Sequence, residues 1–149
     1  MLKIVPFDSK YSASFKSINE QWLNEYIGLD ASDLYVLENP EQAILAKGGH
    51  ILLALENDEV VGTICLEKSG TKTIITKLGV AKMQRGKGIG EKLCLAILEL
   101  ARKKNVQEVW LETSQKLGAA IQLYKKLGFE DMNPNNRSSR CDVLMRLSL

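Results

Sequence analysis

Apolar side chains in the first third of the chain recur at two spacings. Leu2 to Phe7 is a short, mostly apolar run typical of a strand. From about Ser12 to Ile27 the large apolar residues return every three or four positions, which predicts an amphipathic helix that Gly28 would end. A second short helix is expected from Ala31 to Leu37, before Asn39-Pro40 breaks the chain.

The middle of the chain changes to the pattern of strands. Polar turns at 56–59 and 69–70 separate three apolar runs, which extend from His50 to Leu55, from Val60 to Glu67 and from Thr71 to Val80. Consecutive strands joined by such short turns pair in opposite directions. The pattern therefore predicts an antiparallel meander.

Two helices and two strands are expected in the last third. Apolar positions from Ile89 onward keep a helical period up to the basic residues 102–104, whose charges suit the negative end of a helix dipole. Val106 to Thr113 is strand-like, Leu117 to Leu127 is helical, and Arg140 to Leu147 alternates as a final strand. Because no linker or repeat divides the chain, we expect one domain over residues 1–149, of the α/β (α+β) class, with helices on the faces of a mixed sheet.

Composition and charge narrow the classes of function. Apolar residues make up 45% and charged residues 26%, the balance of an ordinary globular protein. A net charge of +2 without a basic run predicts no nucleic-acid partner, and apolar stretches far shorter than about 20 residues predict no membrane span. The first residues lack the apolar core of a signal peptide. We therefore expect a cytoplasmic protein.

The cysteines and the single histidine predict no metal site. Cys65, Cys94 and Cys141 are widely separated and form no CxxC pair, and His50 has no second ligand at a suitable spacing. None of the cysteines has a nearby histidine that would activate it as a nucleophile. All three are expected to serve packing in a reducing compartment.

Three glycines at alternate positions follow the third strand of the meander. The segment Arg85-Gly86-Lys87-Gly88-Ile89-Gly90 joins that strand to a long helix. Residues without a Cβ can take positive φ and let successive N–H groups converge on a phosphate, and a helix N-terminus adds partial positive charge. Arg85 and Lys87 add full charges beside it. The segment predicts an anion-binding loop.

Spacing alone excludes a P-loop and leaves two other interpretations of this loop open. A P-loop needs Ser or Thr after its lysine, but Gly88 follows Lys87. A dinucleotide-binding fold needs GxGxxG, and Leu93 stands where the third glycine belongs, although Glu108 or Glu112 could mimic the expected acid. The loop could also be only a flexible basic turn.

Two motifs in order resemble the GNAT N-acetyltransferase superfamily. Residues 85–90 match its Q/R-x-x-G-x-G/A signature, at the end of the Leu78-Gly79-Val80 strand, and residues 123–129, Leu-Tyr-Lys-Lys-Leu-Gly-Phe, match its LYxxLGF-like segment. The element order agrees over essentially the whole chain, although the N-terminal third carries no motif. The resemblance implies a mixed, mostly antiparallel sheet of about six to seven strands flanked by about four helices.

The resemblance also implies where acetyl-CoA, the cosubstrate, would bind. Its pyrophosphate would lie on the backbone amides of Arg85, Gly86, Lys87, Gly88, Ile89 and Gly90. Its pantetheine arm would pair like an added strand with Leu78 and Val80, in a splayed gap of the sheet, and Gly79 would ease a bulge or a close approach.

In this family the acyl group passes directly to an amine, and a tyrosine protonates the leaving thiolate. Tyr124 matches that tyrosine and is the predicted general acid. A backbone N–H such as that of Val80 could stabilise the charge on the thioester oxygen. On spacing alone Tyr124 shares a helical face with Ala120 and Leu127, so core packing is the alternative for its ring.

The chain departs from the family pattern at two positions. Ile74 stands where many relatives carry a glutamate base, and Leu117 stands where they often carry an asparagine. The base could then be a chain of waters or another carboxylate, for which Glu25, Asp30, Asp33 and Glu112 are unranked candidates.

The acceptor is expected to be an amine of a small molecule or a peptide, and the protein a monomer or homodimer. Residues 22–38 carry four acidic side chains and no basic one, which suggests a cationic acceptor. The missing glutamate suggests a second hypothesis, a non-catalytic CoA-binding regulatory module. A dinucleotide-binding oxidoreductase is the third.

Overall fold

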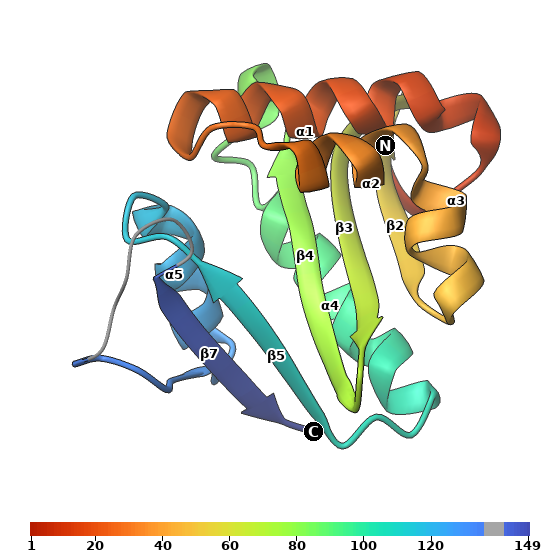
Figure 1. The fold of residues 1–149 in the computed structure, drawn as a ribbon. Coiled ribbons are helices and arrows are strands. Elements are labelled where there is room, and N and C mark those ends of the chain that lie inside the picture. Colours follow the sequence, from red (N-terminus) through yellow and green to blue (C-terminus); the bar gives the residue numbers. More distant parts are fainter. Residues whose placement is uncertain (136–141) are drawn as a thin grey trace.

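Seven strands form one sheet in the order β1-β2-β3-β4-β5-β7-β6 (Figure 1). The computed structural model describes residues 1–135 and 142–149. The strands are β1 (Leu2–Pro6), β2 (His50–Glu56), β3 (Glu59–Ser69), β4 (Lys72–Val80), β5 (Glu108–Thr113), β6 (Glu130–Asp131) and β7 (Val143–Ser148), and the α-helices are α1 (Ser12–Tyr26), α2 (Ala31–Glu38), α3 (Pro40–Ala43), α4 (Ile89–Lys103) and α5 (Gly118–Lys126).

The predicted fold class is confirmed. Every neighbouring pair of strands is antiparallel except β4 and β5, which run parallel. This topology excludes the doubly wound parallel sheet that a dinucleotide-binding oxidoreductase would need. The first two helices and the meander lie within one or two residues of the predicted bounds.

Two short elements escaped the prediction. The sequence predicts only a chain break at Pro40, but Pro40 stands at the start of α3, where its missing N–H costs no hydrogen bond. The two residues of β6 are too few to produce a periodic signal. The last strand was predicted from Arg140; residues 140 and 141 lie outside the described residues, and the strand begins at Val143.

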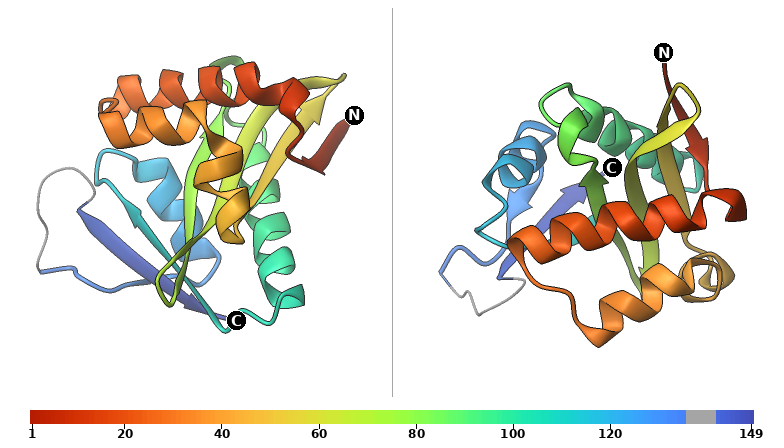
Figure 2. Two further views of the ribbon diagram at one scale, coloured as in Figure 1. Left: turned by 45° about the vertical axis from the view of Figure 1, so that its right-hand side comes forward. Right: turned by 90° about the horizontal axis from the view of Figure 1, so that it is seen from above.

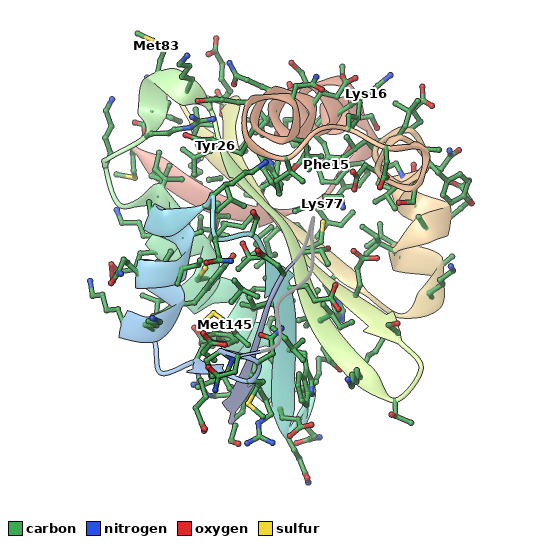
Figure 3. The ribbon with its side chains drawn as sticks, turned by 60° about the vertical axis from the view of Figure 1, so that its left-hand side comes forward. Phe15, Lys16, Tyr26, Lys77, Met83 and Met145 are labelled. Atoms are coloured by element: carbon green, nitrogen blue, oxygen red, sulfur yellow. The ribbon has the colours of Figure 1, made fainter. Side chains whose placement is uncertain are left out.

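Helices cover both faces of the sheet (Figures 1 and 2). α1, α2 and α3 lie over one face, and α4 and α5 lie over the other. Alternation along β3 serves both layers, because Cys65 packs under α1 while Ile64 and Leu66 pack under α4. Phe15 points from α1 into the core on its side of the sheet, and Met145 belongs to the core on the other side (Figure 3).

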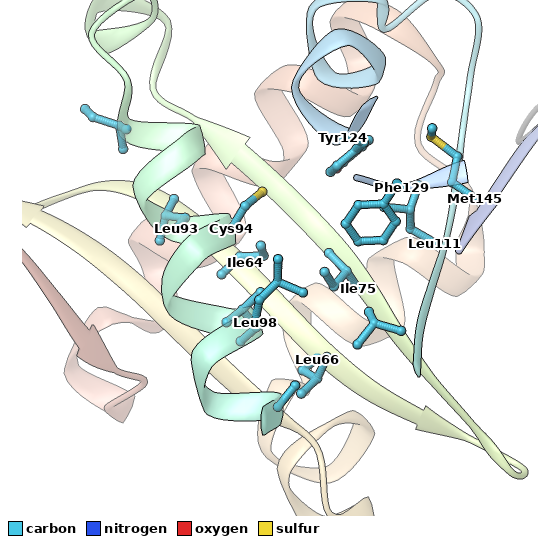
Figure 4. Close-up of a cluster of buried hydrophobic side chains, with 14 of the residues drawn as sticks. Ile64, Leu66, Ile75, Leu93, Cys94, Leu98, Leu111, Tyr124, Phe129 and Met145 are labelled. Atoms are coloured by element: carbon cyan, nitrogen blue, oxygen red, sulfur yellow. The ribbon is translucent and has the colours of Figure 1, made fainter. Parts of the chain in front are cut away.

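The larger core lies between the sheet and the pair α4 and α5 (Figure 4). Leu93, Ile97 and Met145 are completely buried there, and Cys94 is 1% exposed. Burial raises the pKa of the Cys94 thiol to about 12 and also raises that of Cys65, so both act as small core residues. Cys141, for which packing was also predicted, lies outside the described residues.

β4 and β5 part soon after they meet. Their parallel register has only two residue pairs, Ile74 with Trp110 and Ile75 with Leu111. Toward their carboxyl ends the strands diverge (Figure 1). The sheet therefore contains the splayed gap that the resemblance implied.

Candidate functional site

A β-bulge shapes the end of β4 that borders the gap. Thr63 of β3 pairs with Gly79, and Cys65 pairs with Thr76, so two residues of β4 oppose one of β3. Lys77, in the bulge, has a φ of 54°, a left-handed conformation that is uncommon for a residue with a side chain. The bulge lies just before Gly79.

Side chains from α1 and β3 hold this bulge. The Thr63 hydroxyl donates to the Lys77 carbonyl over 2.8 Å and accepts from Asn19 Nδ2 over 3.1 Å. Asn19 Nδ2 also donates to the Phe15 carbonyl, and its Oδ1 accepts from Trp22 Nε1 over 2.8 Å. Since Asn19 and Thr63 are fully buried, their bonded polar groups fix the position of α1 over β4.

Gly79 allows the close approach that its position predicted. A Cβ there would lie 2.4 Å from both Cδ1 and Nε1 of Trp22. The indole of Trp22 thus packs directly on the backbone of β4. This places Trp22 in the interface between helix and sheet.

The backbone of Val80 faces the gap. The Ala81 N–H donates to the Val61 carbonyl over 2.8 Å, so this pair is hydrogen-bonded across β3 and β4. In an antiparallel ladder the adjoining pair, Gly62 and Val80, is then the kind without hydrogen bonds. The N–H and C=O of Val80 consequently point away from β3, toward the gap between β4 and β5.

The glycine-rich loop presents a row of free backbone donors. Gly86 and Gly88 have φ of 82° and 79°, and a Cβ on either would meet open space. Gly88 is the N-cap of α4 and lends no side chain to its first N–H groups. Within the described residues, none of the backbone N–H groups from Gly86 to Gly90 has a hydrogen-bond partner. Such a row, at a helix N-terminus, is an anion site.

Gly90 differs from the other two glycines of the loop. It lies inside α4 without a positive φ, and a Cβ would make only ordinary contacts with Leu123 and Val80, at 3.8 and 3.9 Å. Its role in conformation is therefore smaller than the sequence suggested. The acidic Glu91 in the first turn of α4 is paired with Lys126 of α5 at 2.8 Å.

Arg85 is bound to α1. Its Nη1 donates to Glu25 Oε2 over 3.1 Å and to Oε1 over 3.3 Å, and its Nε donates to the Val80 carbonyl over 3.1 Å. The guanidinium also stacks on Tyr26, 5.7 Å from the ring centroid, and Nη2 is buried without a protein partner among the described residues. Lys87, by contrast, reaches only Gln84 within the loop, over 3.1 Å.

Tyr124 lies on α5 with its ring in the larger core (Figure 4). The ring meets Phe129 edge to face, with centroids 5.6 Å apart. Its hydroxyl forms no hydrogen bond to any of the described residues. Desolvation, with a smaller contribution from Cys94, raises the pKa of this phenol well above its usual value. Tyr124 therefore packs its ring in the core and keeps its hydroxyl protonated at the same time.

Three of the four candidate bases are engaged elsewhere. Glu25 pairs with Arg85, Asp33 pairs with Lys77 at 3.2 Å, and Asp30 caps α2 by accepting from the Asp33 N–H. Glu112 is exposed on β5 and makes no hydrogen bond or ion pair with the described residues.

Glu112 borders the gap. Ile75 and Leu111 pair within the core, so Ile74 and Trp110 point to the opposite face of the sheet. Two residues further along each strand, Thr76 and Glu112 share that face where the strands separate.

Comparison with known proteins places this arrangement in a family. A family model described as acetyltransferase (GNAT) family matches residues 15–129, which include both the glycine-rich loop and Tyr124. The chain belongs to the GNAT acetyltransferase family.

Individual GNAT proteins are similar over nearly the full length. N-alpha-acetyltransferase 30 of Schizosaccharomyces pombe is 29% identical over 134 residues, 87% of this chain and 84% of that protein. A GNAT acetyltransferase structure from Staphylococcus aureus Mu50 has a TM-score of 0.87 at 25% identity, covering 100% of this chain and 99% of its own. The yncA structure of Salmonella typhimurium, solved with acetyl-CoA, has a TM-score of 0.77 at 21% identity, covering 100% and 94%.

The structure removes the reason for expecting a cationic acceptor in this GNAT chain. The acidic side chains of residues 22–38 are not an uncompensated cluster, because Glu25, Asp33 and Glu38 are paired with Arg85, Lys77 and Lys16. Their partners lie far away in the sequence, so a count within the segment overestimates its negative charge.

Two features of the GNAT site were missed in the sequence. Asn19 interrupts the apolar face of α1, between Phe15 and Trp22, and a polar residue at such a position signals a buried hydrogen bond. Glu67 pairs across β3 and β4 with Ile74, and it accepts a hydrogen bond from the Thr76 hydroxyl. A carboxylate therefore lies near position 74, on the neighbouring strand.

The described parts of this GNAT chain show neither a metal-binding cluster nor a membrane-spanning helix. No group of three His, Cys, Asp or Glu side chains there is arranged to hold a metal ion. No helix in residues 1–135 and 142–149 is both long enough and apolar enough to cross a membrane.

Proposed function

We propose that the protein transfers an acetyl group from acetyl-CoA directly to a primary amine of a small molecule or peptide. One observation carries the proposal: the free N–H groups from Gly86 to Gly90 lie at the end of β4, next to its gap with β5. An anion site therefore lies next to an open strand edge. Acetyl-CoA needs both, because its phosphates require an anion site and its extended amide arm can pair with a strand edge.

The chain offers suitable groups along the whole length of this cosubstrate. The pyrophosphate would bind the N–H groups of residues 86–90, where the absent side chains of Gly86 and Gly88 leave room. The amide arm would lie along β4 at Leu78 and Val80, whose gap-facing side has no strand partner beyond Ile75. The gap-facing N–H of Val80 is the candidate donor to the thioester oxygen.

Glu112 is the proposed general base. An alkyl amine has a pKa of about 10.4 and must lose a proton before it attacks a thioester. Glu112 alone among the four candidates makes no hydrogen bond or ion pair with the described residues, and it borders the gap on β5. Ile74 cannot accept a proton, and its neighbour across the two strands is Trp110, which cannot accept one either.

Tyr124 is the proposed general acid. Its raised pKa keeps the phenol protonated at neutral pH, so a proton is available for the CoA sulfur as it leaves as a thiolate. As the amine nitrogen forms the amide bond and the thioester C–S bond breaks, the amine gives its proton to Glu112 and the phenol gives its proton to the sulfur. The two roles together need no covalent intermediate on the protein.

Among amines, a peptide α-amino group is the first acceptor to test. The relative from Schizosaccharomyces pombe carries the name N-alpha-acetyltransferase, and an α-amine with a pKa of about 7.7–8.0 needs less help from a base than a lysine does. A CoA-binding regulatory module is the second candidate function, favoured by the isoleucine at position 74.

The test is acceptor-dependent release of free CoA thiol. The chain is incubated with acetyl-CoA and a panel of peptides, amino acids and small amines, and thiol is measured against acetyl-CoA alone. Acceptor-dependent release, with the acetylated product confirmed by mass, supports the proposal. Tight acetyl-CoA binding without release across the panel would support the regulatory module.

A further inference from the structure

Arg85 lies between three parts of the site. Its Nε reaches the Val80 carbonyl, which faces the gap, and its Nη1 reaches Glu25 on the last turn of α1. The guanidinium lies over the ring of Tyr26, the final residue of α1, whose place beside the glycine-rich loop is visible in Figure 3. The side chain thus bridges α1 and the edge of β4.

The charge of Arg85 already has a partner. Glu25 is ionised at neutral pH, since its hydrogen bond to Arg85 lowers the pKa of its carboxyl. The two side chains are only 28% and 31% exposed. An arginine held this way adds little net positive charge to the loop, whereas Lys87 has only the neutral Gln84 beside it.

This contact joins the last turn of α1 to the loop. α1 has no basic residue in its last turn to hold its carbonyl end, and it runs into Gly28, which has a φ of 99°. The buried Asn19 network anchors α1 one to two turns earlier. Beyond Trp22, the polar contacts between α1 and the loop are those that Arg85 makes with Glu25 and Tyr26.

We propose that Arg85 is a positioning residue, which ties the last turn of α1 over the opening between β4 and β5 and so forms the wall against which the acceptor amine is placed. The inference rests on the proposed acetyl transfer for its effect on turnover. It assigns the pyrophosphate to the loop N–H groups and Lys87, and it assigns Arg85 to the acceptor side.

Three variants separate this role from phosphate binding. Arg85→Met removes the tie and keeps the aliphatic stem, Glu25→Gln removes its partner, and Lys87→Met removes the neighbouring charge of the loop as a matched control. We expect Arg85→Met and Glu25→Gln each to raise the acceptor KM or lower kcat by about tenfold, because small misplacements of a reactant are costly. The double variant should be no worse than either single variant.

For the affinity of CoA we expect the opposite order, with a larger effect from Lys87→Met than from Arg85→Met. By calorimetry, Arg85→Met should change the Kd for CoA by less than about threefold, while Lys87→Met should raise it by about fivefold to tenfold, as one lost charge beside a phosphate implies. Arg85→Met that weakens CoA as much as Lys87→Met does, or Glu25→Gln that tightens CoA by releasing the arginine, would overturn the proposal.

A third readout does not need turnover. In a Trp110→Phe background Trp22 is the only tryptophan, and it lies one turn before Glu25 on α1. Arg85→Met should increase acrylamide quenching of Trp22 while thermal unfolding stays cooperative; unchanged quenching counts against the tie. If the wild-type chain acetylates no amine, the proposed function fails, but the CoA and quenching results still decide the role of Arg85.

Discussion

Lys77 and Asp33 form an ion pair between the bulge of β4 and the first turn of α2, with Nζ 3.2 Å from Oδ1 and both side chains largely buried. The lysine is also the bulge residue with a left-handed backbone. The pair therefore joins α2 to the segment of β4 that borders the gap.

Removing one partner of this pair should be costly. Lys77→Met leaves the Asp33 carboxylate without its cation, and we expect the free energy of unfolding to fall by about 3–5 kcal/mol, as for other broken buried pairs. Urea denaturation measures it. The double variant Lys77→Met with Asp33→Leu should recover much of the loss, and a single variant as stable as wild type would contradict a buried pair.

A methyl group on Gly79 should displace α1. Gly79→Ala would put a Cβ 2.4 Å from the Trp22 indole, so we expect a loss of about 1–3 kcal/mol of stability from overpacking. Gly90→Ala is the matched stability control, because its new Cβ meets atoms only at 3.8 Å or beyond. Equal melting temperatures for the two variants would show that the indole moves aside freely.

Loss of the Tyr124 hydroxyl should lower turnover without unfolding the chain. Tyr124→Phe keeps the ring contact with Phe129, and we expect kcat to fall about 10²-fold or more with the melting temperature within a few degrees of wild type. Thiol release and thermal unfolding are measured together. Tyr35→Phe, on an exposed face of α2, is the control. Full activity of Tyr124→Phe would assign the residue to packing alone.

Glu112→Gln tests the proposed base. The neutral amide keeps the shape but cannot accept a proton, so we expect kcat/KM for the acceptor to fall about 10²-fold at pH 7 and to recover partly at higher pH, where more of the amine is already deprotonated. CoA affinity should be unchanged. Glu108→Gln, on the same face of β5 and bonded to Trp110, serves as control. Wild-type rates in Glu112→Gln would point to water or Glu67.

His50 should make stability fall as the solution becomes acidic. Burial, followed by the charges of Lys104 and Lys68, lowers the pKa of this imidazole below 6.5. The unfolded chain then binds a proton that the folded chain resists, so stability is lost as pH falls through 6.5. His50→Gln should flatten the difference between unfolding midpoints at pH 7 and pH 5.5. A parallel pH dependence in both proteins would rule His50 out.

Local signals predicted the parts of the site that are continuous in the sequence. Gly86 and Gly88 adopt positive φ, and a glycine in the sequence is itself the signal for such a conformation. The helical period placed Tyr124, and the short turns of the meander placed β4 beside β3. Each of these features depends on residues within one element or one turn.

Contacts between distant elements could not be predicted in this way. Arg85 meets Glu25 across 60 positions, and Lys77 meets Asp33 across 44. An ion pair leaves no trace in the hydrophobic period of either partner, so the acidic segment looked unbalanced. Even the parting of β4 from β5 was implied by the resemblance and not by the pattern of apolar residues, because both strands alternate as ordinary strands do.

The parting of β4 from β5 also interrupts the ladder of backbone hydrogen bonds across the sheet. Only two residue pairs join the strands of the N-terminal half to those of the C-terminal half. A ligand whose amide arm lies between the two strands would hydrogen-bond to β4 and so extend the sheet into the gap. Binding of acetyl-CoA in the gap would then also strengthen the connection between the two parts of the sheet. The sheet would be continuous only while the donor is bound.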